Sequence, residues 1–454
     1  MRARTVISAV AVVLTATMGV AVAGVGVASA QTGGSPGVTK TTISVGGVAA
    51  VTNQLGQPYA DGFNGVQAYF NYINAKGGVY GHKFKLVARL DDQDRASGDV
   101  EAVRELVEQD KVFAVMPVVT DIFDGASYLA SKGVPTFGWN INSQWNDGPN
   151  LFGEKGSYLC FTCPEAAPPY LAQQLGVKNV AILAYTAAQS QTCASGMEAG
   201  FKQYGFNVVL VDDSISFGFT DLGSDVDTMK AKNVQFVGTC MDIAGEVNAA
   251  QAIRRAGLPN VKYYAPEGYA PSTLTKYGNE LNGVYFGIDF WPFEDAKHSP
   301  ELTLFVKEMN AIHEPITEQA LSGWINADLL YKGIKLAGPN FTQKSVIDAI
   351  NTKINGYTAN GLRPPVDWAF DGHGPPGANG TQPNTDHETC TAYELFENGK
   401  FVPQFGKPGQ PFVCNTENPL PPVLNSTTLY YRPPKPSEQL PTTATVPTTS
   451  PAVP

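Results

Sequence analysis

Residues 73–83 read INAKGGVYGHK, and this stretch decides how the N-terminal part of the chain folds. It follows an amphipathic run, Asp61 to Ile73, in which apolar residues recur at helical spacing. The helix is predicted to end at Asn74, and the glycine pair Gly77-Gly78 to form a turn. The alternating run KFKLVARL then begins at Lys83 and predicts a strand. The stretch therefore joins a long helix to the second strand of a sheet.

Strands and helices alternate on both sides of this stretch. A strand is predicted at Thr42, and the order continues with helix Asp99–Asp110, strand Val112–Met116, helix Asp121–Ser131 and strand Val134–Trp139. The same order restarts with helix Leu171–Leu175, strand Asn179–Tyr185, helix Ser195–Tyr204, strand Asn207–Val211, helix Asp225–Lys232, strand Val234–Thr239, helix Ala244–Ala256 and a strand that leads to Glu267. Helices Pro300–His313 and Gln319–Lys335 follow. Such alternation predicts parallel sheets with helices on both faces, in two doubly wound α/β lobes. Ligands in α/β sheets lie beyond the carboxyl ends of the strands, so two facing lobes would form a cleft.

The two ends of the chain differ from the rest. Arg2 and Arg4 precede a long Ala/Val-rich stretch that ends in Ala28-Ser29-Ala30. This pattern predicts a secretory signal peptide over residues 1–30, the alternative being an uncleaved membrane anchor. Residues 434–454 are rich in proline and threonine, without a periodic apolar face, which predicts a disordered tail.

Charge and motifs exclude several functions. The net charge is −10 and no block of lysine and arginine occurs, which argues against a nucleic-acid partner. No GxSxG, GxxxxGK or HExxH motif is present, so we expect neither an enzyme nor a cofactor. The five histidines are scattered; His373 and His387 could be metal ligands, but loop residues of a Gly/Pro-rich insertion are the favoured reading.

Six cysteines in an exported chain predict disulfides. Sequence alone does not choose among the 15 pairings that six cysteines allow. Our expected pairs are Cys160–Cys163, Cys193–Cys240 and Cys390–Cys414. The first pair, Cys-Phe-Thr-Cys, could instead be a redox pair or half of a zinc site.

The stretch 73–83, followed by Asp91-Asp92-Gln93, resembles the extracytoplasmic solute-binding proteins of ABC transporters, of the leucine/isoleucine/valine-binding kind. The resemblance continues through residues 255–258 (RAGL) and the APEG stretch around Glu267 to Trp324, and it covers roughly residues 42–402. It implies the type I periplasmic-binding fold, in which a hinge of three crossings joins two lobes. Carried over, lobe one is residues 41–158 and 288–362, and lobe two is residues 159–287 and 363–433.

The resemblance also implies a function. The protein would be an exported, extracytoplasmic monomer that captures a small polar solute in the cleft, such as an amino acid or an amide, and delivers it to an ABC permease. Two other functions stay open: a ligand sensor that uses the same cleft, and a secreted enzyme with an unrecognised site.

The first candidate ligand residue is Glu267, in the sequence Pro266-Glu267-Gly268. In amino-acid-binding relatives, a glutamate in such a stretch meets the ligand's ammonium group. A partly buried carboxylate needs a cation or several donors, and a bound ammonium would supply one. The alternative is a strand-end glutamate that faces solvent or pairs with a protein lysine or arginine.

The second candidate region is the loop after the third strand, with Val119 and Thr120. Relatives hold the ligand carboxylate here with a serine-rich turn at the start of a helix. Asp121 departs from that pattern and would repel a carboxylate unless it faces away as the helix N-cap, which is the role we expect.

The resemblance suggests further pocket residues. Gly138 and Trp139 match a second ligand-binding turn, where Trp139 is either a stacking wall or a residue packed against the hinge. Tyr59 matches a position that borders the pocket, with a surface tyrosine as the alternative. Asp242 and Gln189 fall at or near positions where relatives have ligand tyrosines. For Trp324 we expect a core role.

Overall fold

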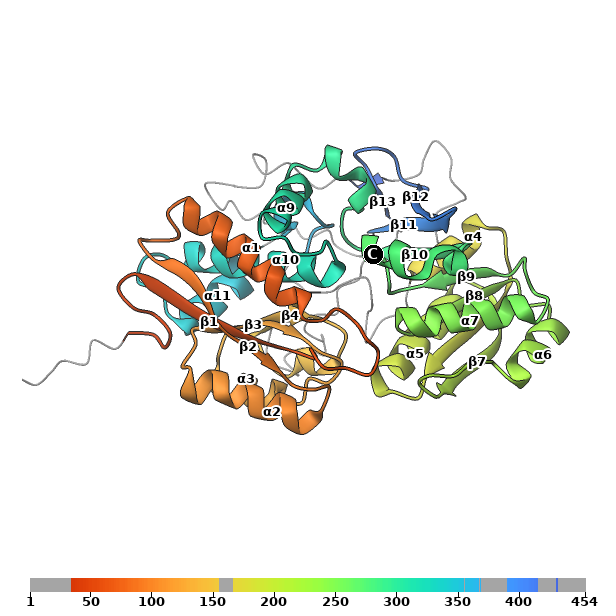
Figure 1. The fold of residues 1–454 in the computed structure, drawn as a ribbon, viewed down its shortest axis with the longest axis horizontal. Helices are drawn as coiled ribbons and strands as arrows, with labels where there is room; N and C mark the ends of the chain where they lie inside the picture. The colour runs from red at the N-terminus through yellow and green to blue at the C-terminus, as the bar shows by residue number, and fades with distance from the viewer. Residues whose placement is uncertain are drawn as a thin grey trace, which may run out of the picture. The chain divides into compact units, whose positions relative to one another are not determined.

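Two β-sheets with helices around them organise the protein in this computed structural model (Figure 1). The structure describes residues 34–154, 166–354, 356–366, 368, 390–414 and 430–431. From Ser35 onward, the described residues belong to one compact unit. Several predictions lie outside the described residues: the signal peptide (1–30), the pair Cys160–Cys163, the loop histidines His373 and His387, and the tail (434–454).

The first sheet has five parallel strands in the order β2-β1-β3-β4-β5. The strands are β1 (Thr42–Ala49), β2 (Lys83–Asp91), β3 (Ala114–Val119), β4 (Thr136–Trp139) and β5 (Leu151–Glu154). The helices between them are α1 (Asp61–Ala75), α2 (Ala96–Arg104), which continues into a π-helical turn (Glu105–Gln109), and α3 (Ala126–Lys132). Every residue of the inner strands β3 and β4 is buried, as expected in a parallel sheet, and so is every residue of the edge strand β5.

Three later helices return to this lobe: α9 (Pro300–Ala311), α10 (Glu318–Ala337) and α11 (Gln343–Lys353). Helix α10 contacts strands β3, β4 and β5, while α9 packs on α1 and α11 on α10. Helix α10 packs against α1 at close range. A Cβ atom on Gly65 would lie 1.7 Å from the main-chain oxygen of Ala320, and one on Gly323 would lie 2.1 Å from that of Gly62. Glycine at these positions therefore allows the two helix backbones to touch.

The second sheet contains nine strands and is mixed. Its parallel part consists of β6 (Asn179–Tyr185), β7 (Asn207–Ile215), β8 (Phe236–Cys240), β9 (Lys262–Ala265) and β10 (Val284–Ile288). Antiparallel pairing adds β11 (Cys390–Glu397), β12 (Lys400–Gln404), β13 (Phe412–Cys414) and β14 (Tyr430–Tyr431). Its helices are α4 (Ala167–Gln174), α5 (Ala188–Gln203), α6 (Ser224–Ala231), α7 (Ile243–Arg255) and α8 (Pro271–Tyr277).

The predicted order of elements agrees with both halves, and the two α/β lobes are present. Several details were wrong. The second sheet is not purely parallel, because the chain returns to it as antiparallel strands after β10. The helix predicted from Asp121 begins only at Ala126, and the helix predicted from Ser195 already begins at Ala188. Residues 151–154 and 284–288, where no strand was predicted, form β5 and β10.

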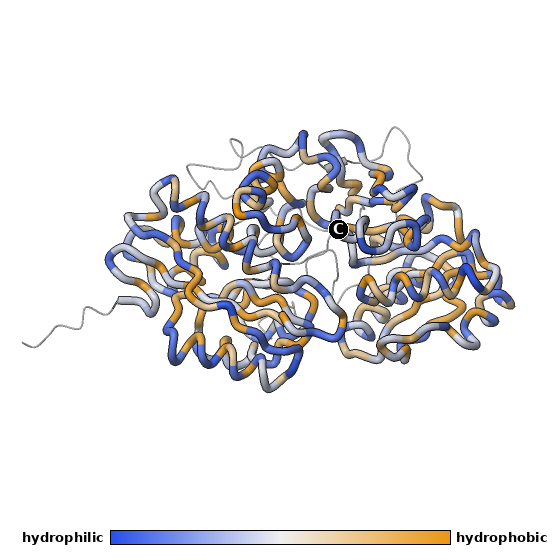
Figure 2. Tube along the Cα trace, viewed as in Figure 1, coloured by the Kyte–Doolittle hydropathy of each residue, from blue (hydrophilic) through white to orange (hydrophobic). Residues whose placement is uncertain are grey.

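Hydrophobic residues follow the strands, while many hydrophilic residues lie along the helices and loops, as Figure 2 shows. Two of the predicted disulfides are confirmed. Cys193–Cys240 ties α5 to β8, and Cys390–Cys414 ties β11 to β13. Each bridge joins elements that are neighbours in the second lobe, so both reinforce that lobe internally.

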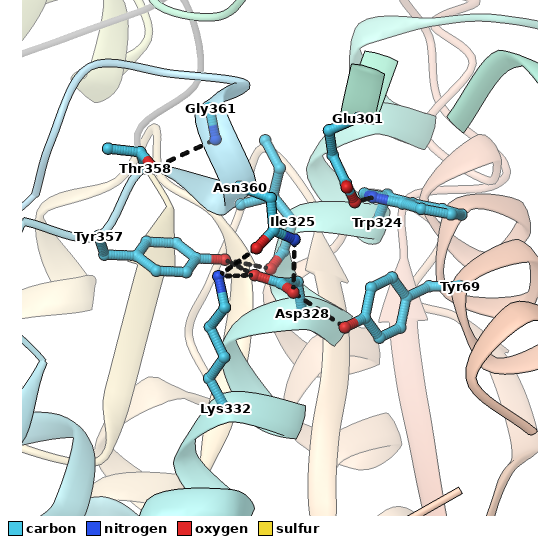
Figure 3. A network of polar contacts seen from close by, with 10 residues as sticks. All are labelled: Tyr69, Glu301, Trp324, Ile325, Asp328, Lys332, Tyr357, Thr358, Asn360 and Gly361. Carbon is cyan, nitrogen blue, oxygen red and sulfur yellow. Dashed lines mark hydrogen bonds and ion pairs between the residues drawn. The ribbon is translucent and has the colours of Figure 1, made fainter. Parts of the chain in front are cut away.

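A polar network around Asp328 holds α10 to its surroundings in the first lobe (Figure 3). The Asp328 carboxylate accepts hydrogen bonds from Tyr69 of α1 (2.9 Å) and from Tyr357 (3.0 Å), and it pairs with Lys332 (2.8 Å). Trp324 is fully buried next to this network, edge-on to Tyr69, with its indole N–H donated to a glutamate of α9. The core role predicted for Trp324 is therefore confirmed.

In the order of the described elements, the chain changes between the two lobes after β5, after β10 and before β11, and one buried ion cluster connects these three passages. Glu154 ends β5, Asp289 follows β10, and Arg363 lies between the Ala359–Gly361 turn near α10 and strand β11. The Arg363 guanidinium lies 2.6 Å from the Glu154 carboxylate and 3.5 Å from that of Asp289. All three side chains are at most 4% exposed. Since a buried cation of this kind must be balanced, the cluster fixes the three passages against one another.

The Arg363 cluster gives a first prediction. Arg363→Met leaves two buried carboxylates without their cation, and this should lower the free energy of unfolding by about 3–5 kcal/mol. The measurement is chemical denaturation followed by circular dichroism. Arg104→Met is the control, because Arg104 forms an exposed ion pair with Glu108 on α2 and its neighbouring turn. Its loss should cost about 1 kcal/mol or less. Equal losses for the two variants would contradict the role assigned to Arg363.

Candidate functional site

Three loops meet at the carboxyl edge of the first sheet, and we call them the first rim: residues 50–60 after β1, 120–125 after β3 and 140–142 after β4. Hydrogen bonds join these loops. The Tyr59 hydroxyl donates to Asp121 Oδ1 (2.9 Å), and the Asn142 side-chain amide donates to the main-chain oxygen of Asp121 (2.7 Å). Because β1, β3 and β4 are parallel and adjacent, their carboxyl ends place the three loops side by side.

Asp121 does not cap a helix, so the N-cap role predicted for it is wrong. The residue at the N-cap of α3 is Gly125, whose N–H donates to Asp99 Oδ2 (2.6 Å). The intervening residues form a turn in which the Thr120 hydroxyl bonds within its own loop, to the N–H and oxygen of Ile122. The Asp121 side chain is thus turned to Tyr59 of the neighbouring loop.

Aromatic residues line the same rim. Gly138 and Trp139 are the last two residues of β4, within the predicted strand and not in a turn after it. Trp139 is 1% exposed and packs against the Tyr59 ring at a centroid distance of 5.5 Å. A Cβ atom on Gly138 would lie 2.2 Å from the Val118 oxygen, so this glycine serves close packing within the sheet. Val119, the last residue of β3, is also buried.

The second rim, at the carboxyl edge of the second sheet, comprises Tyr185 at the end of β6, residues 241–242 after β8 and residues 266–268 after β9. Asp242 caps α7 by accepting hydrogen bonds from the N–H groups of Ala244 (3.0 Å) and Gly245 (3.2 Å). It also accepts one from the Tyr185 hydroxyl at 2.6 Å. Tyr185 was not predicted as a site residue, although its place at the end of a predicted strand was a usable signal.

One hydrogen bond crosses between the rims. Gln57 of the first rim donates its side-chain amide to Asp242 Oδ2 of the second, at 3.2 Å. Electrostatic interactions also cross between the rims. Burial and Asp121 have the largest effects on the pKa of Tyr59, and Glu267 and Asp242 of the second rim raise it further. The two rims are therefore close enough to act on one solute together.

Glu267, on the second rim, lies among other carboxylates, and the largest electrostatic influences on it include no basic residue. Its side chain is 6% exposed, and its Oε1 atom has no hydrogen-bond partner within the described part of the chain. Burial raises the pKa of Glu267 well above its usual value, and the nearby carboxylates of Asp242, Asp121 and Glu318 raise it further. Gly268 follows with a φ of +101°, a conformation that glycine adopts readily and that turns the chain just after the carboxylate.

On the first rim, Asp121 likewise lies among acidic neighbours. Burial and the neighbouring acidic groups Asp94, Asp242 and Asp92 raise its pKa to about 7, although the Tyr59 hydrogen bond lowers it. Strongly perturbed carboxylates at the facing edges of two α/β sheets are typical of functional sites. Gln189 is the exception among the predicted residues: it lies half-buried near the start of α5, and no hydrogen bond or ion pair between described residues joins it to the acidic groups.

Neither a metal centre nor a membrane span is found in the described part of the chain. No group of three or more histidine, cysteine or acidic side chains there could hold a metal ion. None of the described helices has the length and hydrophobicity to cross a membrane.

The periplasmic binding protein family matches residues 42–386, which is most of the chain, and the protein belongs to that family. Its members are extracytoplasmic solute-binding proteins. The chain is 26% identical over 319 residues to the Leu/Ile/Val-binding protein BraC3 of Rhizobium johnstonii, covering 68% of this chain and 83% of the relative. It is 24% identical to the Leu/Ile/Val-binding protein of Escherichia coli K12 over 52% of this chain and 65% of that protein, slightly less than two thirds of its length.

Solved structures share the fold. A branched-chain amino acid ABC transporter protein from Thermus thermophilus, solved with bound valine, superposes with a TM-score of 0.63 and 17% identity over 81% of this chain and 96% of that chain. A solute-binding protein from R. palustris in complex with benzoate gives a TM-score of 0.60 and 16% identity over 80% and 95%. These likenesses establish the type I periplasmic-binding fold that the sequence predicted.

The raised pKa of Glu267 predicts a pH dependence of stability. An acid whose pKa is higher in the folded than in the unfolded protein destabilises the fold as the pH rises above its unfolded value, near 4.5. Ligand-free Glu267→Gln should therefore gain thermal stability over the wild type as the pH rises from 4.5 to 8.5. The measurement is the melting temperature of both proteins across this range.

The matched control is Glu280→Gln, an exposed glutamate in the same lobe. Its melting temperature should follow that of the wild type at every pH. A Glu267→Gln difference that does not change with pH would contradict the buried, unbalanced state of this carboxyl group.

Proposed function

We propose that the protein captures a small polar solute, such as an amino acid, an amide or a related compound, between the two rims and delivers it to an ABC permease. One observation carries the proposal: Glu267 is buried, faces other carboxylates, and has an oxygen without a partner in the described residues. An ammonium group would supply the missing charge and up to three N–H donors. The branched-chain amino acid binding named for the relatives supports the same kind of solute.

In this proposal, the ligand residues are Glu267 and Asp242 on the second rim, and Thr120, Val119, Trp139, Gly138 and Tyr59 on the first, with Gln189 at the periphery. Lobe one comprises residues 41–158 and 288–362, and lobe two residues 159–287 and 363–433. The protein acts as an exported monomer. A solute that contacts both rims favours the conformation in which the two rims are close together and Gln57 donates its hydrogen bond to Asp242. In this proposal, the permease recognises that conformation.

A thermal-shift screen of the purified protein tests the proposal. The library contains amino acids, amides, polyamines and aromatic acids. A solute present at about 100 times its dissociation constant should stabilise the protein by roughly 2.7 kcal/mol, which is readily measured. Glu267→Ala should abolish the shift, whereas Glu280→Ala should retain it. Wild-type affinity in Glu267→Ala would contradict the role of Glu267, and no shift with any solute would contradict solute capture.

A further inference from the structure

The charged groups with the largest influence on Asp121 and Glu267 are acidic. The largest influences on Glu267 besides burial are Asp242, Asp121, Glu318 and Glu246, and those on Asp121 include Asp94, Asp242 and Asp92. No lysine, arginine or histidine is among them in the described part of the chain. The two rims therefore place negative charge on both sides of the proposed solute.

Four of these carboxylates also have an oxygen that no described residue satisfies, those of Glu267, Asp121, Glu246 and Asp92, and the first two belong to the rims. Glu267 Oε1 and Asp121 Oδ2 are both buried and without a hydrogen-bond partner. Glu267 is more than nine-tenths buried and belongs to the second rim, while Asp121 belongs to the first. We propose that the solute is an organic amine without a carboxylate, held between Glu267 and Asp121; this inference rests on the proposed function and narrows it.

A carboxylate on the solute would find little to hold it on the first rim. The Tyr59 hydroxyl already donates to Asp121, and the Thr120 hydroxyl bonds within its own turn. The buried side-chain donors that remain without a partner there are the indole N–H of Trp139 and the amide N–H group of Asn140, which are uncharged. A solute carboxylate would thus add negative charge next to Asp121 with no cation to balance it.

An amine suits the same surroundings. Its ammonium group donates up to three hydrogen bonds and is attracted to each carboxylate. The packed rings of Tyr59 and Trp139 add aromatic surface that favours a cation and the apolar body of the solute. With one ammonium group at Glu267, a second amine at the other end of the solute would reach Asp121 on the first rim, so diamines fit best.

Matched pairs of solutes that differ only by a carboxylate test the inference. The pairs are tyramine with tyrosine, phenethylamine with phenylalanine, isoamylamine with leucine, and cadaverine with lysine. Isothermal titration calorimetry of the purified protein gives the dissociation constant of each member. The amine should bind about tenfold more tightly than its amino acid, or better, in any pair that binds, because the amino acid brings a like charge to Asp121.

Asp121→Asn identifies the source of the preference. Asparagine retains an acceptor for the Tyr59 hydroxyl but removes the charge, so the ratio of amine to amino acid affinity should fall several-fold. Asp124→Asn is the control, since Asp124 is exposed on the same loop and should leave the ratio unchanged. Melting temperatures of both variants, compared with the wild type, establish that each is folded.

The outcomes separate this inference from the proposed function. Tighter binding of amines, reduced in Asp121→Asn, supports both. Tighter binding of the amino acids, or binding only of neutral amides or aromatic acids, overturns the amine inference and leaves solute capture standing. A preference for amines that Asp121→Asn does not change overturns the role of Asp121. No binding of any solute overturns both.

Discussion

The position of the two rims depends on the buried guanidinium of Arg363, which holds together the three passages between the lobes. Its carboxylate partners, Glu154 and Asp289, lie at the ends of strands from different sheets. Arginine remains charged at any relevant pH, so the three passages between the lobes must keep both carboxylates close to it. The strand ends next to these passages carry the two rims, and their relative position therefore depends on the same ions.

The rims are built on the opposite principle. Arg363 balances two carboxylates, whereas the buried Glu267 and the half-buried Asp121 lie among further acidic groups, and the largest electrostatic influences on them include no basic residue. Buried carboxylates without a counter-charge destabilise the ligand-free protein. The carboxylates at the hinge are paired with Arg363, so this destabilisation is found at the two rims, where perturbed groups are typical of a functional site. These carboxylates are the reason that we propose a cationic amine as the solute.

Much of this could be predicted from local sequence. The helix, glycine turn and strand around residues 73–83 have their expected places, and the Pro-Glu-Gly stretch placed Glu267 at a strand end. The rest depends on contacts over long separations. Tyr59 and Asp121 are 62 residues apart, and Gln57 and Asp242 are 185 apart, so no local pattern relates them. The N-cap prediction for Asp121 failed because a buried bond from Gly125 to Asp99 starts the helix later.

The central claim is that a cationic solute binds against the Glu267 carboxyl group, whose pKa is raised by burial and by the neighbouring carboxylates and would be lowered by the bound cation. Proton release on binding tests this most directly. The solute with the largest thermal shift is titrated calorimetrically at pH 7 in two buffers that differ in their enthalpy of ionisation. The account predicts a net release of protons, which Glu267→Gln reduces. Binding without proton exchange, or with proton uptake, would contradict it.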